Sequence, residues 1–122
     1  MSKTILVVDD SRSIREMVAS FLTSAGYEVL TADSGASASQ LLDGRKINLV
    51  VCDVEMPEMD GIEFVSRMKQ LAAYRITPVI MLTTMWTDER KLQGRNAGAK
   101  AWFVKPFDPD KMLAAVTRFI LP

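Results

Sequence analysis

The sequence predicts an α/β fold, in which a doubly wound, five-stranded parallel sheet carries helices on both faces. Five short aliphatic and β-branched runs are spaced along the 122 residues, and segments with apolar residues three to four positions apart separate them. Three of the runs are nearly continuous in Ile, Leu and Val, which is typical of parallel strands buried on both faces. Strand and helix alternate five times, and right-handed crossovers then distribute the helices over the two faces.

The apolar pattern predicts each element in turn. The predicted strands occupy residues 4–8, 28–31, 48–52, 78–82 and 101–104. An apolar stripe after the first strand indicates a helix that ends before Gly26, and it comprises Ile14, Met17, Val18, Phe21 and Leu22. Two further stripes comprise Ile62, Phe64, Val65, Met68 and Leu71, and then Met112, Val116, Phe119 and Ile120. Each stripe supplies a face that can pack on the sheet.

The composition favours a single domain and argues against several functions. A hydrophobic content of 48% suffices for one substantial core, and no linker or repeat interrupts the pattern. Residues 1–122 are therefore expected to form one domain with no output domain. The formal net charge is zero, so the chain as a whole is not steered toward nucleic acid or an anionic membrane. No apolar run approaches the length of a membrane span or of a signal-peptide core.

The cysteine and histidine content excludes further chemistry. The single cysteine, Cys52, excludes an internal disulfide and a structural zinc site, and it favours a cytoplasmic location. The absence of histidine excludes Ser-His-Asp catalysis and histidine-ligated metals. It also excludes phosphohistidine formed on this chain, so a partner must supply any phosphohistidine.

Acidic, hydroxyl and cationic residues follow the predicted strands, at the sheet edge where ligands bind in open α/β folds. Asp9 and Asp10 follow the first strand and Asp53 the third. Thr83 follows the fourth strand and Lys105 the fifth. Carboxylates gathered this closely repel one another unless a cation neutralises them or one of them takes up a proton. Mg²⁺ is the best candidate, because it takes carboxylate, water and phosphate oxygens and needs no histidine or cysteine.

The same side chains can support phosphoryl transfer. A carboxylate can act as nucleophile and form an aspartyl phosphate, while a metal ion, a lysine and a hydroxyl neutralise and orient the phosphoryl oxygens. Asp53 is the predicted nucleophile, because it lies between the acidic pair and the strands that end in Thr83 and Lys105. A flavin or nucleotide site is excluded, since the first turn is acidic and the chain contains neither a dinucleotide-binding glycine motif nor a Walker motif.

These residues belong to a larger set of motifs that resembles one family over essentially the whole chain. The motifs are Asp9-Asp10, Asp53, Met56-Pro57, Asp60-Gly61, Thr83, Gly98-Ala99 and Lys105-Pro106-Phe107. The set is similar to the response regulator receiver domains, especially the single-domain, CheY-like chemotaxis type. The resemblance implies a flavodoxin-like fold with strand order 2-1-3-4-5. It also implies two-component signal transduction, in which the protein is a phosphorylated switch and not an enzyme.

The resemblance assigns the metal ligands. Asp10 and Asp53 would bind Mg²⁺ directly, and Asp9 would support the metal directly or through water. The backbone carbonyl of Glu55 would be the third protein ligand. The side chains of Glu55 and Met85 occupy positions that vary in the family and that tune the lifetime of the phosphoryl group.

The resemblance also assigns the phosphoryl-binding groups. Thr83 and Lys105 would bind the phosphoryl group, and the peptide bond between Lys105 and Pro106 would be cis. Thr84 stands where the family usually has a smaller Ala or Gly, and Trp102 where it usually has Tyr or Phe. We expect Trp102 to be partly exposed before phosphorylation and more buried afterwards, when the Thr83 hydroxyl moves toward the phosphoryl group.

The implied partners are a sensor histidine kinase or a phosphotransfer protein, which donates the phosphoryl group, and a downstream target protein. The protein is expected to be a monomer that binds neither nucleic acid nor a membrane. The expected target-binding face carries Arg90, Lys91, Arg95, Lys100 and Trp102. Its charges are equally consistent with a solvated helix face. Trp86 either anchors a partner or folds over the following helix.

Two alternative functions remain on the sequence alone. One is a phosphohydrolase with an aspartate nucleophile, which the segment Asp53-Val54-Glu55 disfavours, because it has no second aspartate two residues after the first. The other is a degenerate receiver that acts only as a protein-binding module. The intact acidic residues, Thr83 and Lys105 argue against this second alternative, and a phosphorylation assay decides it.

Overall fold

The computed structural model describes residues 2–85 and 87–122, in which strands and helices alternate. The strands are β1 (Thr4–Val8), β2 (Glu28–Ala32), β3 (Leu49–Asp53), β4 (Val79–Thr83) and β5 (Ala99–Val104). The helices are α1 (Arg12–Ser24), α2 (Gly35–Leu41), α3 (Gly61–Gln70), α4 (Asp88–Ala97) and α5 (Pro109–Phe119), with a short 3-10 helix over Ala72–Tyr74. None of the described helices combines the length and apolar character needed to cross a membrane.

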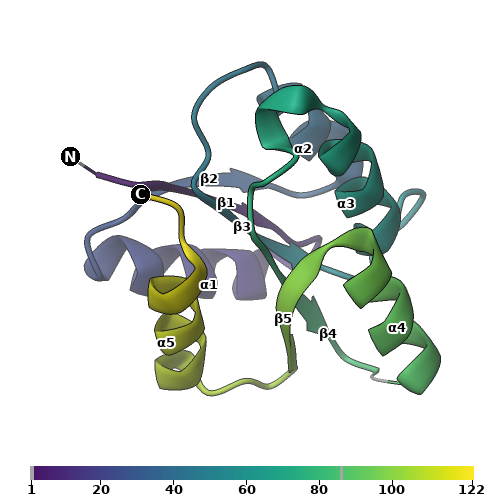
Figure 1. Ribbon diagram of the computed structural model, residues 1–122. Helices are drawn as coiled ribbons and strands as arrows, with labels where there is room; N and C mark the ends of the chain where they lie inside the picture. The colour runs from purple at the N-terminus through teal and green to yellow at the C-terminus, as the bar shows by residue number, and fades with distance from the viewer. Residues whose placement is uncertain (1, 86) are drawn as a thin grey trace.

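The strands form a parallel sheet in the order β2-β1-β3-β4-β5. In its register, Leu6 of β1 pairs with Leu30 of β2 on one side and with Val50 of β3 on the other. Helices α1 and α5 cover one face of the sheet, and α2, α3 and α4 cover the other (Figure 1). The predicted doubly wound fold, with its flavodoxin-like strand order 2-1-3-4-5, is therefore confirmed.

The core has two layers because side chains of a strand point alternately to the two faces of the sheet. In β1, Ile5 and Val7 pack in the layer under α1 and α5, whereas Leu6 and Val8 pack in the layer under α2 and α3. All four side chains are completely buried. This double burial explains why the strand is continuously aliphatic in sequence.

Helix α1 buries the predicted apolar stripe with one exception. Val18 and Leu22 are buried, and Ile14 and Phe21 pack against the same layer. The prediction that Met17 lies in this stripe is wrong, because its side chain is 44% exposed. Successive helical residues are about 100° apart, which places Met17 at the margin of the stripe, beyond the contact with the sheet.

The amino end of β3 differs from the prediction because Asn48 makes contacts of its own. Its side-chain oxygen accepts a hydrogen bond from the Thr4 backbone N–H at 2.9 Å, and its amide nitrogen donates to the carbonyl of Leu121 at 3.2 Å. The strand therefore begins at Leu49 and ends at Asp53, one residue later at each end than predicted.

Strand β5 begins two residues earlier than predicted because it contains an irregularity. Val79 of β4 pairs with Ala99, but the next residue, Ile80, pairs with Ala101. Lys100 is thus an extra residue, as in a β-bulge, and it interrupts the apolar pattern from which the strand was predicted. The carboxyl end of β5, which carries the site residue, is as predicted.

Side-chain caps fix where the helices start after the strands. Ser11 caps α1, Thr87 caps α4 and Asp108 caps α5, each by accepting a hydrogen bond from a backbone N–H in the first turn. Asp60 caps α3 in the same way. These caps hold the loops at the carboxyl ends of the strands in defined conformations.

Candidate functional site

The carboxyl ends of β1 and β3 bring three carboxylates together. Asp9 and Asp53 are buried, with 0% and 1% of their surfaces exposed, whereas Asp10 is exposed. One oxygen from each residue lies within 4.8 Å of the other two. The three predicted acidic residues form one cluster because the strands are neighbours in the sheet, with Val8 opposite Cys52.

Lys105 reaches the same cluster from the end of β5. Its Nζ lies 3.0 Å from Asp9 Oδ2 and 3.1 Å from Asp53 Oδ1. Burial alone lowers the pKa of the Lys105 ammonium, but its contact with Asp9 and the charge of Asp53 raise the pKa by more. The ammonium therefore keeps its proton. The peptide bond between Lys105 and Pro106 is cis, as the family resemblance implied.

The electrostatics of the cluster favour a bound cation. Burial, and then the charge of Asp9, raise the pKa of Asp53 to about 7, although Lys105 acts in the opposite direction. Asp9 Oδ1 accepts a hydrogen bond from the Ser11 N–H at 2.8 Å. Its buried Oδ2 has the ion pair with Lys105 but no hydrogen bond among the described residues. Three carboxylates and an oxygen without a hydrogen bond fit Mg²⁺, a hard cation that takes oxygen ligands.

Gly61 allows α3 to begin directly against Asp53. A Cβ at Gly61 would overlap the backbone carbonyl of Asp53, and the Gly61 N–H donates to the carbonyl of Val54 at 2.8 Å. Glycine is required here by the close approach of two backbone segments. The sequence marked Gly61 only as part of a motif, and its contact with Asp53 was not predicted.

Arg15 is a site residue that the sequence analysis missed. From α1, its Nη1 donates to the backbone carbonyl of Asp9 at 2.7 Å. Together with the cap residue Ser11, it fixes the turn that carries Asp9 and Asp10. The available signal was a basic residue six positions after an acidic one, which is too common to indicate a site.

Thr83 lies at the end of β4, as predicted, but its hydroxyl is engaged away from the carboxylate cluster. This buried hydroxyl donates to Glu55 Oε2 at 2.6 Å and lies 2.7 Å from the carbonyl of Met85. In the part of the chain that the structure describes, no hydrogen bond joins it to Asp53 or Lys105. The Thr83 hydroxyl, at the end of the strand next to β3, thus has Glu55 as its partner and not the carboxylate cluster.

Glu55 holds Thr84 as well as Thr83. Its Oε1 accepts hydrogen bonds from the Thr84 backbone N–H at 2.6 Å and from the Thr84 hydroxyl at 2.7 Å. Burial raises the pKa of Glu55, but the hydrogen bonds from Thr83 and Thr84 lower the pKa by more. The carboxylate is therefore ionised. The family resemblance assigned the Glu55 backbone carbonyl to the metal and gave no direction for the effect of the Glu55 side chain on the phosphoryl lifetime.

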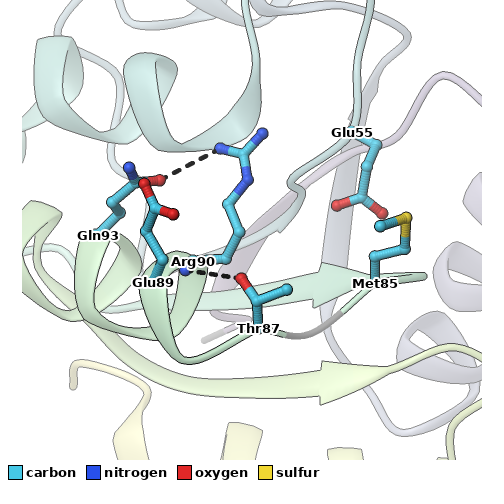
Figure 2. A pocket seen from close by; sticks show the side chains of 6 residues that line it. All are labelled: Glu55, Met85, Thr87, Glu89, Arg90 and Gln93. Atoms are coloured by element: carbon cyan, nitrogen blue, oxygen red, sulfur yellow. Dashed lines mark hydrogen bonds between the residues drawn. The ribbon is translucent and has the colours of Figure 1, made fainter.

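A hollow of about 470 Å³ adjoins Glu55 and the first turns of α4. Its lining residues are Glu55, Met85, Thr87, Glu89, Arg90 and Gln93 (Figure 2). The guanidinium of Arg90 contacts Gln93 Oε1 at 3.4 Å and Asp60 Oδ2 at 3.5 Å. The hollow therefore contains a cation held by two long contacts.

Trp102 is half-buried and packs against the core layer beneath α2 and α3. Lys91 Nζ and Arg95 Cζ lie 5.2 Å and 5.6 Å from the centre of its ring, within the range of cation–π contacts. Two cations of the predicted target-binding face thus have an aromatic neighbour. Trp86, the other tryptophan considered for partner binding, lies outside the described residues.

Comparison with known proteins identifies the family. The family model of the response regulator receiver domain matches residues 5–117. The chain is 40% identical to the phosphate regulon transcriptional regulatory protein PhoB of Pseudomonas aeruginosa, over 93% of this chain and 50% of that protein. It is 36% identical to the chemotaxis protein CheY of Bacillus subtilis, over 97% of this chain and 98% of that protein. The chain thus spans about half the length of PhoB and of other regulators that it resembles, but nearly all of this CheY.

The structural comparison agrees. The structure of the chemotaxis protein CheY4 of Vibrio cholerae matches with a TM-score of 0.93 and 41% identity, over 98% of this chain and 100% of that chain. Receiver domains bind Mg²⁺ at an acidic cluster, and they are in general signalling modules that interact with histidine kinases or phosphotransfer proteins and with downstream targets. The chain belongs to the response regulator receiver domains, and it accepts a phosphoryl group in two-component signal transduction.

Proposed function

We propose that Asp53 is the phosphoryl acceptor and that it acts with Mg²⁺ held by Asp9, Asp10 and Asp53. The observation that carries this proposal is the cluster of three carboxylates with oxygens within 4.8 Å of one another, in contact with Lys105. The backbone carbonyl of Glu55 is the proposed third protein ligand. Among the described residues no backbone N–H donates to that carbonyl.

The transfer step is an in-line displacement at phosphorus. An oxygen of the Asp53 carboxylate forms a bond to phosphorus, while the bond from phosphorus to the donor's imidazole nitrogen breaks and leaves its electron pair on that nitrogen. When bound, Mg²⁺ neutralises carboxylate and phosphoryl oxygens. Lys105, 3.1 Å from Asp53 Oδ1, supplies a second positive charge at the same place. The Thr83 hydroxyl, on the adjacent strand, binds a phosphoryl oxygen once it leaves its present partners.

The phosphoryl donor and the output are proteins. Because the chain has no histidine, the proposed donor is a sensor histidine kinase or a histidine-containing phosphotransfer protein. The proposed output is phosphorylation-dependent binding of a downstream target by the surface that carries Arg90, Lys91, Arg95, Lys100 and Trp102. The cation–π contacts at Trp102 support this surface, because a shift of the ring changes the environment of Lys91 and Arg95.

We further propose that residues 1–122 act as a monomeric receiver domain, bind neither nucleic acid nor a membrane, and work in the cytoplasm. The similarity to a CheY over 98% of that protein's length supports the first point, and the single, buried free thiol of Cys52 supports the last. The protein would be a signalling switch and not an enzyme with an external substrate. The intact cluster at Asp53 gives no support to a degenerate binding module, and Glu55 stands where a phosphohydrolase has its second aspartate.

The proposal is tested by phosphorylation of the purified protein. Incubation with Mg²⁺ and acetyl phosphate should add one phosphoryl group in a base-labile bond, which intact-protein mass spectrometry detects. The Asp53→Asn variant should show no adduct, and Asp43→Asn, which changes an exposed aspartate paired with Arg45, should be phosphorylated as the parent is. An adduct of equal yield on Asp53→Asn would refute the assignment.

A further inference from the structure

The side chain of Glu55 makes three short hydrogen bonds beside the proposed phosphorylation site. Oε2 accepts from the Thr83 hydroxyl at 2.6 Å, and Oε1 accepts from the Thr84 N–H at 2.6 Å and from the Thr84 hydroxyl at 2.7 Å. Hydrogen bonds to an ionised acceptor are roughly twice as strong as those between neutral groups. They join the end of β4 to the loop that follows β3.

The same donors would suit the oxygens of a phosphoryl group on Asp53. Strands β3 and β4 are neighbours, and Asp53 pairs with Leu82, the residue before Thr83. A hydroxyl has one proton to donate. The Thr83 hydroxyl already has two acceptors, Glu55 Oε2 at 2.6 Å and the carbonyl of Met85 at 2.7 Å. It is not available to a phosphoryl oxygen while these contacts persist.

We propose that the Glu55 carboxylate is an internal substitute for the phosphoryl group. In the unphosphorylated protein the carboxylate accepts the hydrogen bonds of Thr83 and Thr84, and it releases these donors when Asp53 is phosphorylated. This inference rests on the proposed function of Asp53. A phosphoryl group carries about −1.5 to −2 charges near pH 7 and repels a nearby carboxylate, which favours the departure of Glu55. Glu55 is thus a positioning residue, because it acts on the transfer through Thr83.

The hollow beside Glu55 provides the place to which the carboxylate moves. Glu55 and Arg90 both line it (Figure 2). Arg90 is 3.5 Å from Asp60 and 3.4 Å from Gln93, at the long limit of hydrogen bonding, and its side chain is 40% exposed. A released carboxylate therefore finds a cation with weak present contacts. Arg90 becomes the partner of Glu55 in the phosphorylated state.

The resting contact is tested by amide hydrogen exchange in the metal-free, unphosphorylated protein. Thr84 is exposed, and Glu55 is the acceptor of its backbone N–H. In Glu55→Ala, exchange at the Thr84 amide should be at least about tenfold faster than in the parent, since a charge-assisted hydrogen bond of about 1.5 kcal/mol is lost. The control is Glu58→Ala, which removes an equal charge from an exposed position in the same loop and should leave this amide unchanged. Equal exchange rates in the parent and in Glu55→Ala would overturn the inference.

The competition with the phosphoryl group is tested with beryllofluoride, a phosphoryl analogue, in the presence of Mg²⁺. Glu55→Ala keeps the backbone carbonyl and should bind beryllofluoride about tenfold more tightly, as measured by ¹⁹F NMR, because no internal acceptor has to be displaced. Glu58→Ala should stay within about twofold of the parent. Unchanged or weaker binding by Glu55→Ala, relative to Glu58→Ala, would overturn the proposal.

A double-mutant cycle tests the role of Arg90. Arg90→Gln should weaken beryllofluoride binding about threefold when Glu55 is present and should have no effect in Glu55→Ala, because the displaced carboxylate is then missing. Equal weakening in both backgrounds would show that Arg90 does not receive Glu55. If the parent itself binds no beryllofluoride with Mg²⁺, the proposed function of Asp53 fails, and this inference fails with it. The hydrogen-exchange experiment needs no phosphoryl analogue, and it therefore tests the contact between Glu55 and Thr84 independently.

Discussion

Replacing Asp53 with Asn should stabilise the metal-free protein, and more so at higher pH. Burial and the charge of Asp9 raise the pKa of Asp53 from 3.8 to about 7. Because its pKa is raised in the folded state, Asp53 contributes to the free energy of unfolding most favourably below about pH 4, and this contribution is lost as the pH rises through about 7. The amide of the Asp53→Asn variant has no charge to bury, so the variant does not lose this stability.

The magnitude follows from the shift. One pKa unit corresponds to about 1.4 kcal/mol, so ionisation of Asp53 costs the metal-free protein up to about 4 kcal/mol above pH 7. About two units separate pH 5 from the folded-state pKa. Between about pH 5 and pH 8, the stability of the Asp53→Asn variant relative to the parent should therefore grow by about 2–3 kcal/mol.

The measurement is urea unfolding in excess chelator at the two pH values, with the denaturant slope checked for constancy. Asp43→Asn is the control. The contact with Arg45 lowers the pKa of Asp43, so the contribution of Asp43 to the free energy of unfolding is constant from about pH 5 to pH 8. If the advantage of the Asp53→Asn variant is the same at both pH values, or smaller at pH 8, the carboxylates do not repel as the structure indicates.

Three further predictions concern the metal, a backbone contact and the switch. Mg²⁺ at about 100 times its dissociation constant should stabilise the parent by about 2.7 kcal/mol in calorimetry and Asp10→Asn by less; equal effects would place the ion elsewhere. Gly61→Ala should cost more than about 2 kcal/mol in urea unfolding, because its Cβ overlaps the carbonyl of Asp53, and an unchanged midpoint would contradict this contact. In a Trp86→Phe background, beryllofluoride with Mg²⁺ should shift Trp102 emission to shorter wavelength, and unchanged emission at demonstrated binding would show that Trp102 is not the switch.

The sequence predicted the architecture because double burial leaves a clear pattern. The continuous aliphatic run of β1 reflects packing on both faces, and the alternation of strands and helices was enough to predict the arrangement of layers. Strand ends were less predictable, since they depend on contacts with distant segments. Asn48 binds Thr4 and Leu121, which are far away in the sequence. Lys100 is an extra residue in β5 opposite β4. A local sequence pattern shows neither feature.

The site was predictable to the extent that strand ends dictate position. Asp9, Asp53 and Lys105 meet because parallel strands end at one edge of the sheet, and their contacts are those expected. The partner of Thr83 was not predictable, because a hydroxyl at a strand end can rotate toward several acceptors. Its bond to Glu55 depends on the path of the loop after β3, which only the folded chain defines.

Asn48 binds residues near both ends of the described chain. It lies at the amino ends of the strands, on the opposite side of the sheet from the carboxylate cluster. Its side chain holds the N–H of Thr4 and the carbonyl of Leu121, so that the two ends lie near each other (Figure 1). This proximity suits circular permutation, in which a short flexible linker joins the old ends and a new opening is made in an exposed loop. Such a rearranged chain would keep the carboxylate cluster intact. A reporter domain could then be attached at the new opening, in an exposed loop close to that cluster.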